Sequence, residues 1–482
     1  MVVPKRSRAG YARAPFVVRS LVVGLTEPQP IPWARPRREL LLLGLIALAT
    51  LFWVYEPNTQ DNSRLCLTRA LVAGRVSADA CFRSLLPSQT DVARYKGHFY
   101  SDKAPGMSAL EIIPAEIVSL PPPTSWAAEG DLRLWAVHLF ASGLPFLLCV
   151  FLVGRISEGL APGYGPAALV TFALGTQMSS LGIAGFDQVL TTTLGFLTFV
   201  LAWKRRPLAA GLAAGAALTT EYEAAAILAI VAVYVALQGK RVVARYALGA
   251  LPGIALLGAY DWAAFGAPWR PSYHYLYNRY AAQQGRGLLG IHIPTLHGTG
   301  QVLLGDRGLL VASPVLLAAA FGLVLLWRRG LRAEAIVCGV ITAGFTIADC
   351  GYFLPYGGGS PGPRFLVPAL PFLALGLGPA FARMRRVVTV LAAASIIAST
   401  AIDMTWDVTG IHYRETIWGE IARLITELGS SRLMHYASKN ALTWGSNRII
   451  GVVVACTFAA ASCVIAVRRP AVPASEGLTR SG

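Results

Sequence analysis

Long apolar segments separated by short polar connections recur along almost the whole chain. Most approach the roughly 20 residues that an α-helix needs to cross a bilayer. The pattern predicts spanning helices at about 39–56, 133–154, 164–184, 188–203, 207–220, 222–238, 246–262, 308–327, 334–354, 365–381, 387–404 and 449–467. The fifth and sixth segments are short and could together form one broken or re-entrant element. The prediction is therefore an all-α polytopic membrane protein with about 12 transmembrane helices.

Composition supports this fold class and excludes a soluble one. Hydrophobic residues make up 55% of the 482 residues and charged residues 14%, and the mean hydropathy is +0.53. A soluble globular chain carries roughly a quarter of charged residues. No soluble core could hide this much apolar surface behind so few charges.

The formal net charge of +17 belongs to the connections between the apolar segments. This distribution argues against nucleic-acid binding and instead follows the positive-inside rule. One set of connections is basic, namely Arg155, 204–206, 240–245, 328–332, 383–386 and 468–469. The alternate short connections, 185–187, 219–221 and 355–363, carry no Lys or Arg. Both termini are therefore predicted to be cytoplasmic.

These assignments divide the chain into three parts. A basic N-terminal segment, 1–38, leads into a full-length apolar span, which predicts a retained helix and no cleaved signal peptide. The transmembrane domain, 39–467, carries three long extracytoplasmic loops, at 57–132, 263–307 and 405–448. A short cytoplasmic tail follows at 468–482. No internal repeat is evident, which disfavours a transporter built from two related halves.

Two of the seven cysteines, Cys66 and Cys81, lie in the first long loop. If this loop is extracytoplasmic, they could form a disulfide, since oxidising compartments favour one. Two free thiols are the equal alternative, because sequence alone does not decide pairing.

The first long loop holds the residues best suited to chemistry. Asp61 follows the first span directly, at the depth where a lipid-linked substrate would lie, and Asp91 comes later in the loop. Residues 100–108 read YSDKAPGMS. A carboxylate can take a proton from an attacking hydroxyl, and Lys103 could neutralise a departing phosphate. The ordinary alternative is a solvated helix cap at Asp61 and a local ion pair between Asp102 and Lys103.

Other ionisable residues are weaker candidates. Glu111 and Glu116 interrupt the apolar run at 107–120, so this segment is predicted to lie along the membrane interface as a helix and not to span. Four acids fall near outer helix ends, where such groups often mark a cavity or pair with an Arg; they are Asp187, Glu221, Asp261 and Asp349. His292 and His297 lack a matched carboxylate at metal spacing and are predicted to be loop residues.

Five short motifs, in this order along residues 60–370, resemble those of bacterial GT-C-superfamily membrane glycosyltransferases, which include protein O-mannosyltransferase-like and lipid A aminoarabinose transferase-like enzymes. The first is YSDKAPGMS itself. The others are TEY at 220–222, FGAP at 265–268 followed by Ser272-Tyr273, RGLLVASP at 307–314 and GGSPGPR at 358–364. Together they indicate the superfamily and say nothing of the substrate.

The resemblance implies roles for particular residues. Asp61 corresponds to the family's first-loop acid, with Asp91 as a second candidate. Lys103 corresponds to the lysine that contacts the carrier phosphate, with Tyr100 and Asp102 beside it and Arg364 as another phosphate partner. The chain departs from the family at 186–187, where relatives often have His, and at Asp261, where they often have Asn. Asp61 is followed by Asn62 and not by a second acid, which makes a poor divalent-metal site; a metal is possible but not indicated.

The leading hypothesis is an enzyme of the bacterial inner membrane that moves a sugar from a polyprenyl-phosphate carrier to an extracytoplasmic lipid, glycan or protein acceptor. The first loop would fold over a cavity at membrane level. One alternative is a secondary transporter of about 12 helices, and another is a catalytically inactive GT-C-like scaffold. The donor sugar, the acceptor and the oligomeric state are not predictable from the sequence.

Overall fold

The computed structural model describes residues 37–52, 58–85, 91–120, 132–182, 184–405 and 448–467. The basic segment up to residue 36, most of the predicted loop 405–448 and the tail after residue 467 lie outside the described residues. The described part of the chain is helical, apart from one short antiparallel hairpin and the connections.

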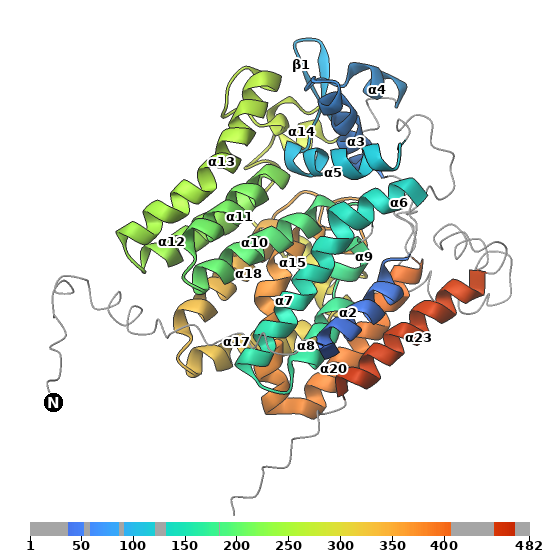
Figure 1. Cartoon of the computed structure of the whole chain (residues 1–482), viewed down its shortest axis with the longest axis vertical. Helices are drawn as coiled ribbons and strands as arrows, with labels where there is room; N and C mark the ends of the chain where they lie inside the picture. The colour runs from blue at the N-terminus through green and yellow to red at the C-terminus, as the bar shows by residue number, and fades with distance from the viewer. Residues whose placement is uncertain are drawn as a thin grey trace, which may run out of the picture.

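The apolar segments fold into helices that pack side by side (Figure 1). Their bounds are α2 (Arg37–Thr50), α6 (Leu132–His138), a π-helical turn (Leu139–Gly143), α7 (Leu144–Leu160), α8 (Gly165–Leu174), α9 (Met178–Gly182), α10 (Asp187–Trp203), α11 (Pro207–Thr220), α12 (Ala224–Ala236), α13 (Lys240–Phe265), α17 (Val315–Arg328), α18 (Arg332–Cys350), α19 (Leu370–Ala374), α20 (Leu377–Thr405) and α23 (Arg448–Val467). Local signals set some ends: Pro207 opens α11, and Gly266, at φ 79°, ends α13 in the left-handed region.

By length and composition, four helical segments in the described residues could each cross a membrane. They are 132–160, α13, α18 and α20. A fifth would be the pair Leu296–Ala312 and α17, which bends by 84° at its break. The remaining apolar helices are shorter than a bilayer requires. A membrane protein is thus supported, whereas the count of about 12 spans stays a prediction.

Three of the predicted spans are broken. The segment predicted at 308–327 is divided at 313–314, between α16 (Leu309–Ala312) and α17. The segment predicted at 164–184 is divided into α8, which ends at Leu174 with Gly175 as its C-cap, and α9, which begins at Met178. The segment predicted at 365–381 begins as a 3₁₀ helix, Arg364–Ala369, and continues as α19. Pro368 and Pro371 explain this irregularity, since proline removes a backbone donor and disturbs the preceding turn. The basic connection predicted near 383 is a break inside α20, where Met384 leaves the helical region.

The first loop forms a small folded cap at one end of the helices (Figure 1). The cap consists of α3 (Thr59–Val72), α4 (Asp79–Ser84), the hairpin β1 (Val92–Tyr95) and β2 (His98–Ser101), and α5 (Pro105–Ile117). A disulfide between Cys66 and Cys81 joins α3 to α4, which resolves the open choice between a bond and two thiols. The predicted interfacial segment at 107–120 is α5, whose face toward α3 includes the buried Glu111.

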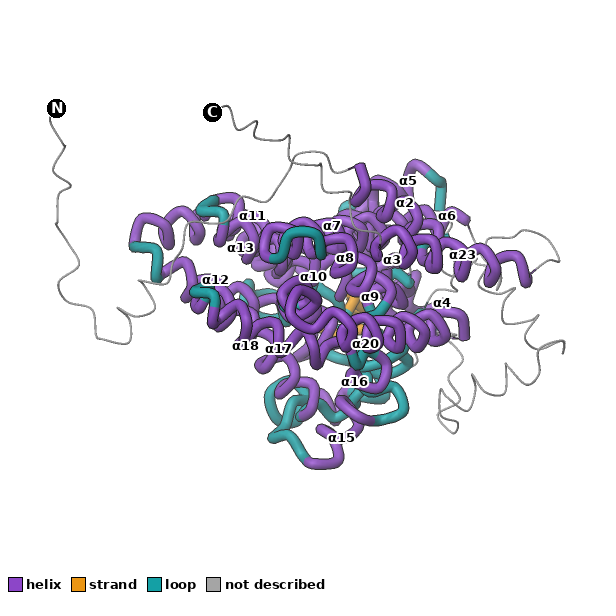
Figure 2. Tube along the Cα trace, turned by 90° about the horizontal axis from the view of Figure 1, so that it is seen from below, coloured by secondary structure: helices purple, strands orange, loops and turns teal. Residues whose placement is uncertain are grey.

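The second loop packs against the cap. It contains a 3₁₀ turn (Ser272–Tyr275), α14 (Ala281–Gln284) and α15 (Leu296–Leu304), and α16 (Leu309–Ala312) follows it. Leu276 forms a β-bridge with Ala93 of β1, and the Tyr277 N–H donates to the Val92 carbonyl at 2.8 Å. The view from below shows α15 and its flanking loops protruding from one side of the helices (Figure 2).

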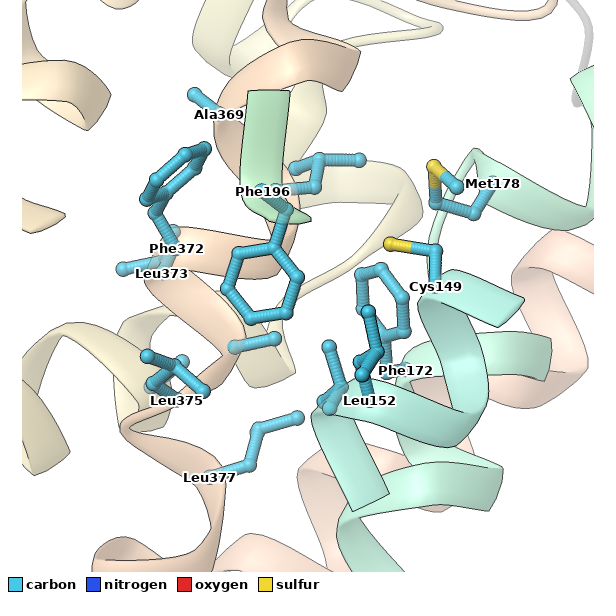
Figure 3. Close-up of a cluster of buried hydrophobic side chains, with 14 of the residues drawn as sticks. Cys149, Leu152, Phe172, Met178, Phe196, Ala369, Phe372, Leu373, Leu375 and Leu377 are labelled. Atoms are coloured by element: carbon cyan, nitrogen blue, oxygen red, sulfur yellow. The ribbon is translucent and has the colours of Figure 1, made fainter. Parts of the chain in front are cut away.

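The largest apolar cluster lies between α7, α8, α10, α17, α19 and α20. Phe196 and Phe199 of α10 pack on Phe372 of α19, with ring centroids 5.3 and 5.7 Å apart, and Cys149 and Phe172 lie in the same interior (Figure 3). This packing fixes α10 against the segment 364–374. Those two elements carry Asp187 and Arg364, so the core positions both residues beneath the cap.

Candidate functional site

A polar cavity of about 360 Å³ lies between the cap and the ends of the helices. Its wall brings together residues far apart in the sequence: 58–60 and Asn62 of α3, Asp91, Asp102, Lys103, Phe186, Gln188, Glu221, Tyr273, 278–280, Gln284, 352–354, 357–359, Arg364 and Phe365. Of the six predicted site residues, Asp91, Asp102, Lys103 and Arg364 line this cavity, whereas Asp61 and Tyr100 do not.

Lys103 is held at the cavity wall by two carboxylates. Its Nζ lies 3.3 Å from Asp91 Oδ2 and 3.3 Å from Asp102 Oδ1, and its backbone N–H donates to Ser101 Oγ at 3.1 Å. The side chain is buried, which disfavours its charge, but Asp102 and Asp91 raise the pKa of Lys103 above its ordinary value. Lys103 is therefore a permanent cation facing a polar cavity.

The pKa values of the two carboxyl groups beside Lys103 are shifted in opposite directions. Burial alone would raise the pKa of Asp91, but the charges of Lys103 and Arg364 hold that pKa below its ordinary value. Burial prevails at Asp102 and raises the pKa of that carboxyl to about 6, although Lys103 opposes the change. Lys103 thus lies beside one firmly ionised carboxylate and one that titrates closer to neutrality.

Arg364 enters the same cavity from the helix-bundle side. It begins the 3₁₀ helix before α19, and its guanidinium lies 5.5 Å from the Phe186 ring and 4.9 Å from the Phe365 ring. The charge of Arg364 also lowers the pKa of Asp91, so the cavity wall carries two cations, Lys103 and Arg364, that both stabilise one carboxylate. An anionic ligand could replace that carboxylate as their partner.

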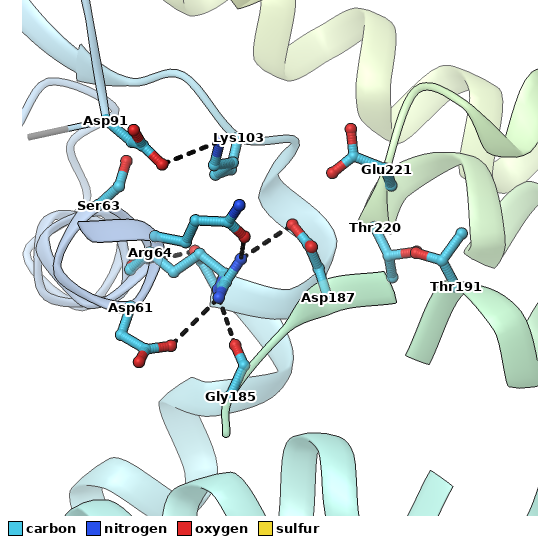
Figure 4. A network of polar contacts seen from close by, with 12 residues as sticks. Asp61, Ser63, Arg64, Asp91, Lys103, Gly185, Asp187, Thr191, Thr220 and Glu221 are labelled. Atoms are coloured by element: carbon cyan, nitrogen blue, oxygen red, sulfur yellow. Dashed lines mark hydrogen bonds and ion pairs between the residues drawn. The ribbon is translucent and has the colours of Figure 1, made fainter. Parts of the chain in front are cut away.

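Asp61 belongs to a buried network beneath the cavity (Figure 4), and Arg64 joins this network to the cavity wall by donating to Gln60 Oε1 at 3.3 Å. Asn58 accepts from the Asp61 N–H, while Asp61 accepts from the Asn58 N–H, forming a capping box at the start of α3. The other Asp61 oxygen lies 3.2 Å from Arg64 Nη2. Burial raises the pKa of Asp61 to about 7 in spite of Arg64.

Arg64 is the centre of this network, and sequence reasoning did not identify it. Its side chain has no exposed surface, and its Nη1 lies 2.9 Å from Asp187 Oδ2 at the start of α10. It also donates to the Gly185 carbonyl (Figure 4). Arg64 therefore ties the cap to the α9–α10 turn. One feature of the sequence could have identified Arg64. Its spacing from Asp61 places both side chains on one face of a helix, where they can pair.

Tyr100 also lies away from the cavity. Its ring packs on Phe265 with centroids 5.2 Å apart, within an apolar cluster that includes Leu67, Ala93 and Tyr260. In this position Tyr100 attaches β2 to the end of α13. Its role beside a carrier phosphate stays a prediction, although Tyr100 is not part of the cavity wall.

A second cavity, of about 350 Å³, adjoins the first and is mostly apolar. The two cavities share Glu221, Tyr273, Gln284, Tyr352 and Phe365. Three carboxylates line the second cavity, from Glu221, Glu223 and Asp349. Of the four acids predicted near outer helix ends, Glu221 and Asp349 face a cavity, Asp187 pairs with Arg64, and Asp261 accepts from Tyr222 Oη at 3.3 Å.

The described residues offer no ready site for a metal ion, since no three of their His, Cys, Asp and Glu side chains converge suitably. The cavity instead offers cations, carboxylates and amides. Its chemistry therefore fits an anionic ligand held beside a carboxylate that can accept a proton.

No known family model matches the chain, and no curated protein matches it in sequence. Its fold is similar to that in the crystal structure of ArnT from Cupriavidus metallidurans bound to undecaprenyl phosphate. The TM-score is 0.51, with 13% sequence identity, over 94% of this chain and 76% of that one. This likeness supports the GT-C-like fold that the motifs predicted. At such low identity it shows the fold alone.

Proposed function

We propose that the chain is a membrane glycosyltransferase that moves a sugar from a polyprenyl-phosphate carrier to an acceptor outside a bacterial inner membrane. The observation that carries the proposal is that Lys103, Arg364 and Asp91 line one polar cavity, where Lys103 Nζ lies 3.3 Å from Asp91 Oδ2. The GT-C-like fold and the polyprenyl phosphate bound by the ArnT structure support the choice of carrier.

In the proposed reaction, an acceptor hydroxyl attacks the anomeric carbon of the donor sugar. The bond between that carbon and the carrier phosphate oxygen breaks, and polyprenyl phosphate leaves with the bonding electrons. Lys103 and Arg364 bind the phosphate and stabilise the negative charge that develops on it. A carboxylate takes the proton from the acceptor hydroxyl.

Asp91 is the carboxylate to which we assign this proton transfer. It lines the cavity, whereas Asp61 is buried below it, and a general base must first be within reach of the proton it removes. A phosphate bound to Lys103 would weaken the ion pair between Lys103 and Asp91. The pKa of Asp91 would then rise, and its carboxylate would become a stronger base. Asp61 then serves the site by holding Arg64 and the start of α3.

The test is transfer of radiolabelled sugar from polyprenyl-phosphate donors by the purified protein, with cell-envelope material as the acceptor. Wild type should use at least one donor. Lys103→Ala should lower the rate by about 100-fold or more, the usual effect of removing one group that stabilises developing charge. Asp91→Asn should lower it by a similar factor, since general-base catalysis contributes about 100-fold or more.

Lys96→Ala is the matched control, because Lys96 is exposed at the tip of the same hairpin and does not line the cavity. This variant should retain the wild-type rate. Absence of transfer by wild type from every donor, with acceptor present, would refute the proposed activity. Full activity of Lys103→Ala would instead leave the activity standing and refute the phosphate site.

A further inference from the structure

The apolar cavity beside the phosphate site contains carboxylates whose hydrogen-bonding needs are not met. Asp349, on α18, is 2% exposed, and neither of its carboxyl oxygens has a hydrogen-bond partner among the described residues. Glu223 Oε1 is likewise without a partner. Buried polar groups are almost always satisfied, because leaving one without a partner destabilises the folded protein. Both side chains line the cavity, so a ligand there would supply the missing donors.

Most of the remaining cavity wall is apolar or aromatic, although Glu221 and Gln284 also line it. Phe345, Ala348 and Leu289 contribute aliphatic and aromatic surface, and Phe365 meets Tyr352 edge to face with centroids 5.0 Å apart. Small-molecule sites typically combine such surfaces with a few polar groups that fix orientation, in volumes of roughly 300–1,000 Å³. The cavity has these properties at about 350 Å³.

We propose that this cavity holds the sugar ring of the lipid-linked donor, with sugar hydroxyls donating to Asp349 and Glu223. The inference rests on the proposed function and assigns the sugar subsite of the same enzyme. A ring bonded directly to a phosphate must lie next to the phosphate site, and the two cavities share Glu221 and Tyr273. A polyprenyl chain fits this cavity poorly, because hydrocarbon would leave the carboxylates buried without donors.

Two variants of α18 test the assignment. Asp349→Leu removes the acceptor and replaces an unpartnered buried acid with an apolar side chain, a change that folded proteins commonly tolerate. Gly344→Leu fills the cavity, and a Cβ at Gly344 meets no atom within 4 Å. Gly339→Leu is the matched control, since its Cβ is equally free but lies in the groove between α17 and α18.

The measurement is native mass spectrometry of each protein with three lipids: undecaprenyl phosphate, and the same carrier bearing mannose or arabinose. Wild type should bind at least one sugar-bearing lipid more tightly than the bare lipid. Asp349→Leu should weaken that binding by about 10-fold or more, because the sugar loses a hydrogen-bond acceptor. Gly344→Leu should weaken it by at least as much, because its side chain occupies the space of the ring. Their affinity for the bare lipid should not change, and Gly339→Leu should keep the wild-type preference.

Three other results would each overturn the inference. Equal weakening of bare and sugar-bearing lipids by Gly344→Leu would place the hydrocarbon chain in the cavity. Unchanged binding in both cavity variants would show that the ligand does not enter it. A wild type that never prefers a sugar-bearing lipid would exclude a sugar subsite. In all three cases sugar transfer by wild type would still support the proposed function. Failure of the sugar subsite can therefore be distinguished from failure of the proposed function.

Discussion

The surroundings of Asp91 and Asp61 give these two carboxylates opposite acid–base properties. Lys103 and Arg364 overcome the effect of burial and hold the pKa of Asp91 below 3.8, its ordinary value. Burial overcomes Arg64 and raises the pKa of Asp61 to about 7. A carboxylate accepts a proton only when it is ionised. The two candidate bases therefore predict different responses of the reaction to pH.

With Asp91 as the base, titration of Asp61 should not govern the rate. We predict that Asp61→Asn retains the pH dependence of wild-type kcat/KM between about pH 5 and about pH 9, because kcat/KM reports essential groups of the free enzyme. The measurement is the pH profile of sugar transfer for both proteins. If Asp61 were the base, the wild-type rate would rise through about pH 7 as its carboxyl ionises, and the variant would lose that rise.

The sequence predicted the residues of the cavity better than the residues that support it. Lys103 and Asp102 lie in one motif and Arg364 in another, so local patterns sufficed to single them out. The pairing of Arg64 with Asp187 joins residues 123 positions apart, and no local pattern specifies that contact. The burial of Asp61 depends on the same fold. Sequence therefore could not distinguish an acid that lines the cavity from one beneath it.

At the scale of elements, α11 and α13 pack closely through small residues. Gly211 and Gly215 of α11 face Gly249 and Gly253 of α13, and a Cβ at any of the four would fall on the backbone of the facing helix. Small residues spaced by four let helices approach in membranes, where packing drives association. This spacing was readable in the sequence and would have predicted the pair. The pair matters for the site because α11 ends next to Glu221, and α13 leads into the second loop.

Separating these two helices should therefore impair both stability and activity. We predict that Gly253→Leu destabilises the protein by at least the roughly 1–3 kcal/mol typical of overpacking, because its side chain would meet the Gly215 backbone. Thermal unfolding in detergent, together with sugar transfer, measures the effect. Gly44→Leu in α2 is the control, since a Cβ there meets no atom within 4 Å. Equal unfolding temperatures for the two variants would contradict the close packing.

The hydrophobic pattern predicted helices well where they run without a break and less well where they bend. Windows of apolar residues detect length and composition but not a change of direction. The pair Leu296–Ala312 and α17 turns by 84°, and the span predicted at 365–381 begins as a 3₁₀ helix before α19. Pro314 and Pro368 lie at these two positions, but the run of apolar residues continues through both of them. The number of complete spans therefore could not be predicted from the sequence pattern.

Across the whole molecule, the basic connections and the cap lie at opposite ends of the helices. At the start of α2, Arg38 donates to the Ile465 carbonyl near the end of α23, and Glu39 pairs with Arg155 of α7 at 2.8 Å. Arg329, between α17 and α18, donates to Leu160 at the end of α7. At the other end the cap contains the Cys66–Cys81 disulfide. Disulfides persist in oxidising compartments, so the disulfide and the positive-inside rule favour the same orientation.

This orientation predicts which engineered thiols an impermeant reagent can reach in intact cells. In a background without the five free cysteines, Lys96→Cys, at the exposed tip of the cap hairpin, should be labelled at once. Arg205→Cys, exposed in the turn between α10 and α11, should be labelled only after the membrane is permeabilised. The reverse pattern would place the cavity in the cytoplasm. Transfer to an extracytoplasmic acceptor would then be impossible, and the disulfide would need another explanation.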